Sequence, residues 1–505
     1  MTPSESRLNQ PPGFGRSAGS LPFLWFLLAS LVAVSAGSFW IDEFVTARYA
    51  GWPNLHEAWK DMVRIKTAEV QMPFYMVYVW LYEKAFGTGE WALRFATVPW
   101  LVVGMTALTV SLRNRGLGVV TIIVLGLSPF VWYYQNEARL YAMQLGATAL
   151  VVAALFGLCR EPEHSEQEES FWAYSFVAGI SLLSAISMLG MIWASSALLA
   201  ALFLLRGRRL WEWWKKRRMS TLFLLVILTG LGLYYLWSVK AGARATSVAT
   251  TNLQTVAFVF YETLGFAGLG PGRSELREVG VSSLKPFLPL LLCYAATVSV
   301  FLTAGVLEMA RISSWKTISR LAGCLMFPAA FLLSTGVLMQ FRVLGRHFSP
   351  LVVVFLVTLA FGGERVWKRG GLARRGLVAA FVGLALASCL SLRFAPRHAK
   401  DDYHSAALIA KGVMDRGGTV WWNAEEIGAQ YYGLSTSRAA ASAGQVTCLI
   451  NPEPGFTDKL ERPHVIIASK PDIYDAAGTV AAYLVLHGYR LETVLPAFKV
   501  WRRND

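Results

Sequence analysis

Long apolar stretches separated by short polar loops run along the chain to about residue 394. An α-helix needs about 20 apolar residues to cross the hydrocarbon core of a bilayer, and many of these stretches approach that length. We therefore predict a polytopic α-helical membrane protein with about 11 spans, some of them short. The predicted spans are residues 21–40, 92–112, 117–134, 141–159, 171–188, 190–205, 219–238, 286–307, 321–340, 348–363 and 376–393.

The loops between these stretches predict an orientation. Short loops rich in Arg and Lys stay in the cytoplasm. Four such loops share one side if the N-terminus is cytoplasmic and the segment 72–86 does not cross. That segment is short, begins with Pro73 and carries Glu83 and Lys84, so we predict an interfacial helix on the outer face. The basic loops are 113–115, 206–218, 311–320 and 365–375.

The composition agrees with a membrane protein. Of 505 residues, 55% are hydrophobic and 16% are charged, and the mean hydropathy is +0.44, which excludes a soluble domain of this size. The net charge of +15 is explained by cytoplasmic anchoring, with anionic lipid or phosphate ligands second, and nucleic acid is a poor partner. The five cysteines form no CxxC motif, so the sequence predicts neither a zinc motif nor a disulfide framework.

Residues 395–505 change in character, because charged and turn residues occur throughout. Short strand-like and helix-like segments alternate there, which predicts a small α/β domain, extracytoplasmic by the parity of the spans. We therefore predict a membrane domain over 1–394 and a soluble domain over 395–505. The expected strands are 419–422, 446–450, 464–468, 490–494 and 497–502, and the expected helices are 402–415 and 473–487.

Asp42 and Glu43 directly follow the first apolar stretch. Carboxylates at the mouth of a membrane helix are costly where water is scarce. They either mark where the helix leaves the bilayer, or one of them is a general base or metal ligand facing a cavity.

Three other polar segments fall on the same predicted outer face: residues 71–75, 133–141 and 342–350. Carboxylates can activate a hydroxyl nucleophile, and arginines present forked donors to a phosphate leaving group. Each segment alone has a simpler explanation. Glu137 and Arg139 fit an interfacial ion pair, and the arginines of 342–350 fit snorkelling side chains. The gathering of all four segments at one face favours a catalytic site.

The order of these motifs resembles the GT-C superfamily of membrane glycosyltransferases. Within it, the chain is most similar to bacterial glycosyltransferase family 39-like proteins, which are relatives of protein mannosyltransferases and of the lipid A aminoarabinose transferase. The resemblance covers the chain to about residue 395 and is densest over 39–141. The motifs are Trp40-x-Asp-Glu43, Pro73-Phe-Tyr75, Gly87-x-Gly-Glu-Trp-Ala-Leu-Arg94, Ser128-Pro-Phe130, Tyr134-Gln-Asn-Glu-Ala-Arg-x-Tyr141 and Arg346-His-Phe-x-Pro350.

The resemblance implies an inverting transfer of a sugar from a polyprenyl-phosphate donor to an acceptor hydroxyl outside the membrane. The acceptor would be a glycan, a lipid or a protein, and the enzyme would lie in the bacterial inner membrane. Asp42 matches the catalytic base, and Arg346 matches a basic residue near the donor phosphate. The predicted site comprises Asp42, Glu43 and Glu137 for catalysis and Tyr75, Arg139, Tyr141, Lys240, Arg342, Arg346 and His347 for substrate binding.

The sequence predicts no certain cofactor and leaves a divalent metal open. Two positions where the family often has another residue bear on this. Gln71-Met72 stands where a His or second Pro is common, and the hairpin tip at 188–191 lacks a common His. Two other functions remain as alternatives. One is a lipid or polyprenyl-phosphate transporter or flippase, which would favour ionisable residues at mid-span. The other is a non-catalytic scaffold that binds polyprenyl phosphate.

Overall fold

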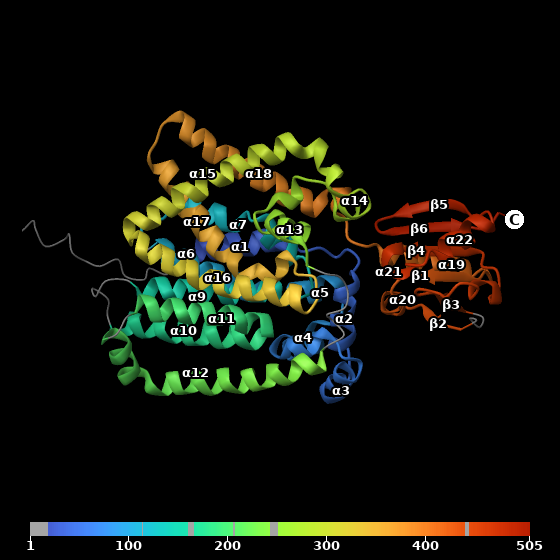
Figure 1. Ribbon diagram of the computed structural model, residues 1–505, viewed down its shortest axis with the longest axis horizontal. Coiled ribbons are helices and arrows are strands. Elements are labelled where there is room, and N and C mark those ends of the chain that lie inside the picture. Colours follow the sequence, from blue (N-terminus) through green and yellow to red (C-terminus); the bar gives the residue numbers. More distant parts are fainter. Residues whose placement is uncertain are drawn as a thin grey trace, which may run out of the picture.

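The computed structural model describes residues 19–113, 115–159, 166–205, 208–242, 251–439 and 444–504. A large helical part is followed by a six-stranded sheet with its own helices, which we call the α/β unit (Figure 1). Eight helical segments of the described chain are long and apolar enough to cross a membrane. The prediction of a polytopic helical membrane protein with a small C-terminal α/β sheet is therefore confirmed.

Most of the predicted spans correspond to one long helical segment each. Two shorter apolar helices, α1 (Ser20–Ala33) and α11 (Met188–Leu204), accompany them. The eight long segments are Glu90–Arg113 (α5, Glu90–Phe95, and α6, Val98–Arg113), Tyr141–Leu158 (α9), Glu166–Ile186 (α10), Lys215–Ala241 within α12 (Arg208–Ala241), Gly280–Ile312 (η4, Gly280–Phe287, and α15, Leu288–Ile312), Trp315–Leu338 (α16), Gly345–Lys368 (η5, Gly345–Phe348, and α17, Ser349–Lys368) and Leu372–Phe394 (α18).

Two predicted spans differ in the structure. The stretch 117–134 forms two short helices, α7 (Val119–Gly126) and α8 (Pro129–Gln135), instead of one. Ser128 caps α8 by accepting a hydrogen bond from the Val131 N–H, and a proline at the first helical position favours a new start. The first span, predicted over 21–40, ends at Ala33 in the structure. The residues after it are not helical and lead to α2 (Ile41–Ala50).

The segment 72–86, predicted as an interfacial helix, and the segment 206–218, predicted as a basic loop, are also helical where the structure describes them. The short segment 72–86 forms α4 (Pro73–Phe86), which begins at its proline as expected. The basic segment 206–218 lies outside the described residues at 206–207, and from Arg208 it is helical. It continues into the predicted span as α12, with a kink at Arg217.

Small residues allow the central helices to pack closely. A Cβ atom on Gly104 of α6 would lie 2.0 Å from the carbonyl oxygen of Gly146 on α9. A Cβ atom on Gly146 would lie 2.2 Å from the Trp100 carbonyl oxygen. The two backbones therefore approach too closely to leave room for a side chain at either glycine, and such close approach gains dispersion energy between membrane helices.

The α/β unit is a mixed sheet with strand order β2-β3-β1-β4-β6-β5. The strands β1 to β4 pair in parallel, and β6 pairs antiparallel with both β4 and β5. Successive side chains of a strand point to opposite faces. Accordingly Trp421 packs on Tyr483 of one helix and Trp422 packs on Tyr403 of another. The strands are β1 (Val420–Asn423), β2 (Ser435–Ser437), β3 (Gln445–Cys448), β4 (Val465–Ser469), β5 (Arg490–Leu495) and β6 (Phe498–Arg502), and the helices are α19 (Tyr403–Met414), α20 (Glu426–Tyr431), α21 (Pro471–Tyr474) and α22 (Thr479–Leu486).

An aromatic cluster joins the α/β unit to α2. The ring of Phe44 lies 4.9 Å from that of Tyr403, 5.4 Å from that of Tyr431 and 5.8 Å from that of Tyr432. The Tyr431 hydroxyl also donates a 2.8 Å hydrogen bond to the Thr88 carbonyl. Because Phe44 follows the acidic pair directly, the α/β unit packs against the helix that carries the candidate site.

Candidate active site

Asp42 and Glu43 lie in the first turn of α2. Negative charge is stabilising there, because the unpaired N–H groups and the helix dipole make the N-terminus positive. The Glu43 carboxylate accepts a hydrogen bond from the Trp40 N–H at 3.2 Å, which ties it to the start of its own helix. The neighbouring Asp42 carboxylate has a different partner, Arg346.

Glu43 is completely buried and fully paired. Arg94, also completely buried, donates two hydrogen bonds to its carboxylate, at 2.8 and 2.9 Å. The Ala138 N–H donates at 2.7 Å and the Lys400 ammonium at 3.1 Å. Burial opposes ionisation, but Arg94, Lys400 and the backbone donor outweigh it and lower the pKa of Glu43 to about 2. Glu43 is therefore a charged anchor within the site.

Arg94 also fixes the chain that leads to α2. Its guanidinium donates to the carbonyls of Ser35, Gly37 and Ser38, at 2.9, 2.6 and 2.9 Å. This extended stretch has no helical hydrogen bonds of its own, so the arginine supplies its partners. The buried pair of Glu43 and Arg94 thus determines where Asp42 lies.

Asp42 is partly exposed and makes an ion pair with Arg346. The two side chains are 29% and 19% exposed, and the Arg346 guanidinium lies 2.8 Å from the Asp42 carboxylate. The guanidinium also lies over the rings of Trp40, at 5.6 Å, and Tyr141, at 5.7 Å. Burial would raise the pKa of Asp42, but Arg346 and Arg139 outweigh it and lower it. A partly exposed carboxylate and a guanidinium therefore meet at one point.

Arg139, in the segment 133–141, contacts both α2 and the chain just before the segment 71–75. It forms an ion pair with Glu69 at 2.8 Å. It also donates 3.1 Å hydrogen bonds to the Asp42 carbonyl and the Thr46 hydroxyl. Glu69 belongs to the short helix η1 (Ala68–Gln71), which precedes α4. Tyr75 of α4 is buried near Arg139, and its hydroxyl has no hydrogen-bond partner among the described residues.

Glu137 differs from the other acidic residues of the cluster. It is completely buried, and neither of its carboxylate oxygens has a hydrogen-bond partner among the described residues. Burial raises the pKa of Glu137 to about 6, although nearby Lys400 and Arg273 oppose the shift. A buried carboxyl that titrates near neutrality is typical of a functional site.

Arg273 is brought to the cluster by the long loop region between α12 and α15. It forms an ion pair with Glu262 of α13 (Leu253–Thr263), and its guanidinium lies 4.1 Å from the centroid of the Tyr133 ring. The Glu262 carboxylate also accepts a hydrogen bond from the Gly345 N–H at 3.1 Å. Glu262 therefore links this loop region to the segment that carries Arg346.

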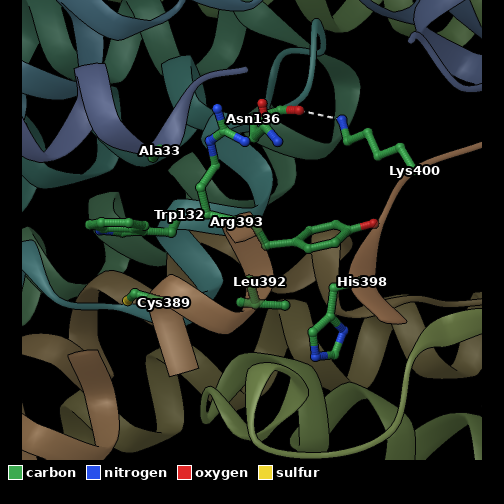
Figure 2. Close-up of a pocket in the computed structure, with 9 residues that line it drawn as sticks. Ala33, Trp132, Asn136, Cys389, Leu392, Arg393, His398 and Lys400 are labelled. Atoms are coloured by element: carbon green, nitrogen blue, oxygen red, sulfur yellow. Dashed lines mark hydrogen bonds between the residues drawn. The ribbon is translucent and has the colours of Figure 1, made fainter. Parts of the chain in front are cut away.

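A cavity of about 20 Å³ lies beside this cluster, between α8, the end of α18 and the chain that follows it (Figure 2). This volume is enough for about one water molecule. In Figure 2 the Lys400 ammonium points to the Asn136 carbonyl, with His398 and Arg393 on the other walls. The space next to the acidic cluster is small and has positive charges around it.

The structure thus brings all four predicted segments together. The remaining predicted residues lie nearer the edge. His347 uses its ring nitrogen to accept a hydrogen bond from the Leu344 N–H. Arg342 and Lys240 are exposed, and no hydrogen bond or ion pair within the described ranges joins either to the cluster. They stay predictions.

Sequence reasoning missed Glu69, Arg94, Glu262, Arg273 and Lys400 as site residues. Arg94 was part of a matching motif, and its position beside an apolar stretch is a usable signal. Glu69, Glu262 and Arg273 lie in short helical elements between the long apolar helices, and Lys400 lies in the chain after α18. The local sequence carries no sign of which side chains face them. In the described part of the chain, no group of three or more His, Cys, Asp and Glu side chains is placed to hold a metal ion.

The fold and this cluster define the class: a multi-pass helical membrane protein with an acidic and basic cluster beside a C-terminal α/β unit. Comparison with solved structures identifies the fold. The chain matches apo ArnT from Cupriavidus metallidurans with a TM-score of 0.55 and 14% identity, over 95% of this chain and 97% of that one. The same protein bound to undecaprenyl phosphate matches with a TM-score of 0.51 and 13% identity, over 95% and 97%.

Arabinofuranosyltransferase AftD from mycobacteria matches more weakly, with a TM-score of 0.42 and 13% identity, over 96% of this chain and 40% of that one. No protein-family model matches the sequence, and no curated protein sequence does. The chain therefore has the fold of ArnT, as the similarity of its motifs led us to expect.

Proposed function

We propose that this protein is a membrane glycosyltransferase that moves a sugar from a polyprenyl-phosphate donor to an acceptor hydroxyl. The observation that carries the proposal is the ion pair of Asp42 and Arg346, at 2.8 Å, in a protein with the ArnT fold. A carboxylate can take a proton from the acceptor, and an arginine can bind the phosphate that leaves. The ArnT structure with undecaprenyl phosphate supports a polyprenyl-phosphate ligand.

The reaction would proceed by direct displacement. The acceptor oxygen attacks the anomeric carbon while Asp42 takes its proton, and the bond from that carbon to the phosphate oxygen breaks. The electron pair stays on the phosphate, whose charge Arg346 stabilises. Attack opposite the leaving group inverts the anomeric configuration.

Binding of the sugar donor would also activate the base. In the free protein Arg346 lowers the pKa of Asp42, which makes the carboxylate a weak base. A phosphate that takes over the guanidinium removes this stabilisation, so the pKa of Asp42 rises. The carboxylate becomes a stronger base only when the sugar donor is present.

The other residues would hold the substrates in line. Arg139 and Tyr141 surround Asp42 and Arg346, and Tyr75 presents a buried hydroxyl without a partner. Glu137 would bind a sugar hydroxyl, and Glu43 would act by positioning Asp42, since its oxygens are already engaged. We place the site and the α/β unit outside the inner membrane, with the N-terminus in the cytoplasm.

The test is turnover by the purified full chain in detergent with a panel of polyprenyl-phosphate sugars and candidate acceptors. We expect release of polyprenyl phosphate with at least one sugar, and a product of inverted anomeric configuration. Binding of sugar donors without release by the wild type, across glycan, lipid and protein acceptors, would instead support the scaffold or the flippase. Retention of configuration would contradict direct displacement.

A further inference from the structure

Lys400 enters the site from an unexpected part of the chain. It lies in residues 395–402, which connect α18 to α19 and which we call the connector. Its ammonium donates hydrogen bonds to the Glu43 carboxylate, at 3.1 Å, and to the Asn136 carbonyl (Figure 2). The side chain is only 15% exposed.

The connector is held in place without Lys400. Arg397 donates to the Ser391 hydroxyl at 2.9 Å, and Asp401 makes an ion pair with Lys470. The Asp402 N–H donates to the Pro496 carbonyl at 3.0 Å. Burying a lysine is costly unless its charge is paired. Since other contacts already fasten the connector, they do not explain why Lys400 lies in the acidic cluster.

Pairing with Glu43 does not supply that reason. Arg94 already gives Glu43 a positive partner with two hydrogen bonds. The two cations and one carboxylate leave a net positive charge, and Glu137 lies nearby with both oxygens unpaired. Asn136, the residue that Lys400 binds through its carbonyl, directly precedes Glu137.

We propose that Lys400 is a positioning residue of this site, which brings a positive charge from the connector to the unpaired Glu137 carboxyl and holds the Glu137 loop against Glu43. The inference rests on the proposed function for its role in transfer. It also means that the C-terminal part of the chain completes the site, because the helical part alone lacks this cation.

The charges around Glu137 come from four elements. They are Lys400 of the connector, Arg273 of α14 (Arg273–Glu278), Glu43 of α2 and Arg346 of η5. Of these, Lys400 opposes the effect of burial on the pKa of Glu137 most strongly. Lys400 is itself still mostly charged at pH 7, although burial lowers its pKa to about 8.

His398 and Arg393 share the cavity with Lys400. Burial and the charge of Arg397 lower the pKa of His398 to about 4, so this ring is neutral above pH 5 and adds no charge there. Loss of the Lys400 charge therefore leaves Arg273 and Arg346 as the cations around Glu137.

The first experiment is an infrared titration of the full chain in detergent between pH 4 and 9, following the carbonyl band of protonated Glu137, assigned with Glu137→Gln. We expect a wild-type midpoint at about pH 6. In Lys400→Met the midpoint should rise by about one pH unit, since removal of one close positive charge makes ionisation harder. Lys400→Arg should keep the wild-type midpoint. An unchanged midpoint in Lys400→Met would overturn the proposal.

The matched control is Arg397→Met, which removes another cation from the same connector and should leave the midpoint unchanged. If Lys400→Met does not fold, Lys400→Gln retains hydrogen-bonding capacity without the charge and should show the same rise. The pH profile of sugar transfer forms the second readout, and its acidic limb should follow the infrared midpoint. A shifted midpoint with no turnover by the wild type would support the charge role of Lys400 and reject the proposed function.

Discussion

Arg346 and Asp42 are 304 residues apart in the chain, and their side chains form an ion pair at 2.8 Å. One group is suited to accept a proton and the other to bind a phosphate, so a sugar donor would compete with Asp42 for the same guanidinium. In the proposed mechanism, this competition would couple binding of the sugar donor to activation of Asp42 as the base.

Arg346→Ala should weaken use of the sugar donor more than it changes the fold. Loss of a charge-assisted hydrogen bond, worth about 1.5–3 kcal/mol, should lower kcat/KM about 10- to 100-fold. Steady-state kinetics with varied sugar donor measures this. Arg64→Ala, at an exposed arginine of α3 (Leu55–Ile65), is the control and should behave as the wild type. An unchanged kcat/KM in Arg346→Ala would remove Arg346 from the phosphate site.

Arg94→Met should destabilise the protein strongly. It leaves the completely buried Glu43 carboxylate without its main partner, which costs about 3–5 kcal/mol. The double variant Glu43→Gln with Arg94→Met should recover part of this loss, because it also removes the buried carboxylate charge that Arg94 paired. Denaturant unfolding in detergent measures both. Equal stability of the single and double variants would mean that the pair is not coupled.

The stability of the wild type should depend on Glu137. Its pKa is 4.5 in a model peptide and about 6 in the folded protein. The folded state therefore binds the proton more tightly, and stability falls by about 2 kcal/mol as the pH rises through this range. Glu137→Gln should remove this loss, so the variant should gain stability relative to the wild type at pH 8 compared with pH 4. A difference that does not change with pH would contradict the raised pKa.

Gly104→Ala should separate α6 from α9. The added Cβ would lie 2.0 Å from the Gly146 carbonyl oxygen, and backbone cannot yield as a flexible side chain does. We expect a loss of about 3 kcal/mol or more and a low yield of monodisperse protein in gel filtration. Gly230→Ala on α12 has no atom within 4 Å of the new Cβ and should be tolerated. Full stability of Gly104→Ala would show that the two helices are not held this closely.

The helical architecture was largely predictable, because the length of each apolar stretch can be read from the local sequence. The break between α7 and α8 was missed, although Ser128 and Pro129 form a recognisable start signal for a helix. The helix α20 was missed as well. It is six residues long and is stabilised by contacts with α2, which local sequence does not encode.

The candidate site was predictable only in part, for the same reason. Asp42, Glu137, Arg139 and Arg346 lie in motifs that can be recognised. Their partners cannot, since a lone Lys400 in a polar connector looks like any solvated lysine until the fold places it beside Glu43.

The most direct test of the central claim compares single-turnover transfer by the wild type and by Asp42→Asn, with binding of the sugar donor measured on the same samples. Asn keeps the size of the side chain and loses the ability to take a proton. We predict that Asp42→Asn binds the sugar donor, remains folded and transfers at least about 1,000-fold more slowly. Glu57→Gln, at an exposed acid of α3, should transfer at the wild-type rate. Normal transfer by Asp42→Asn would contradict the assignment of Asp42 as the base.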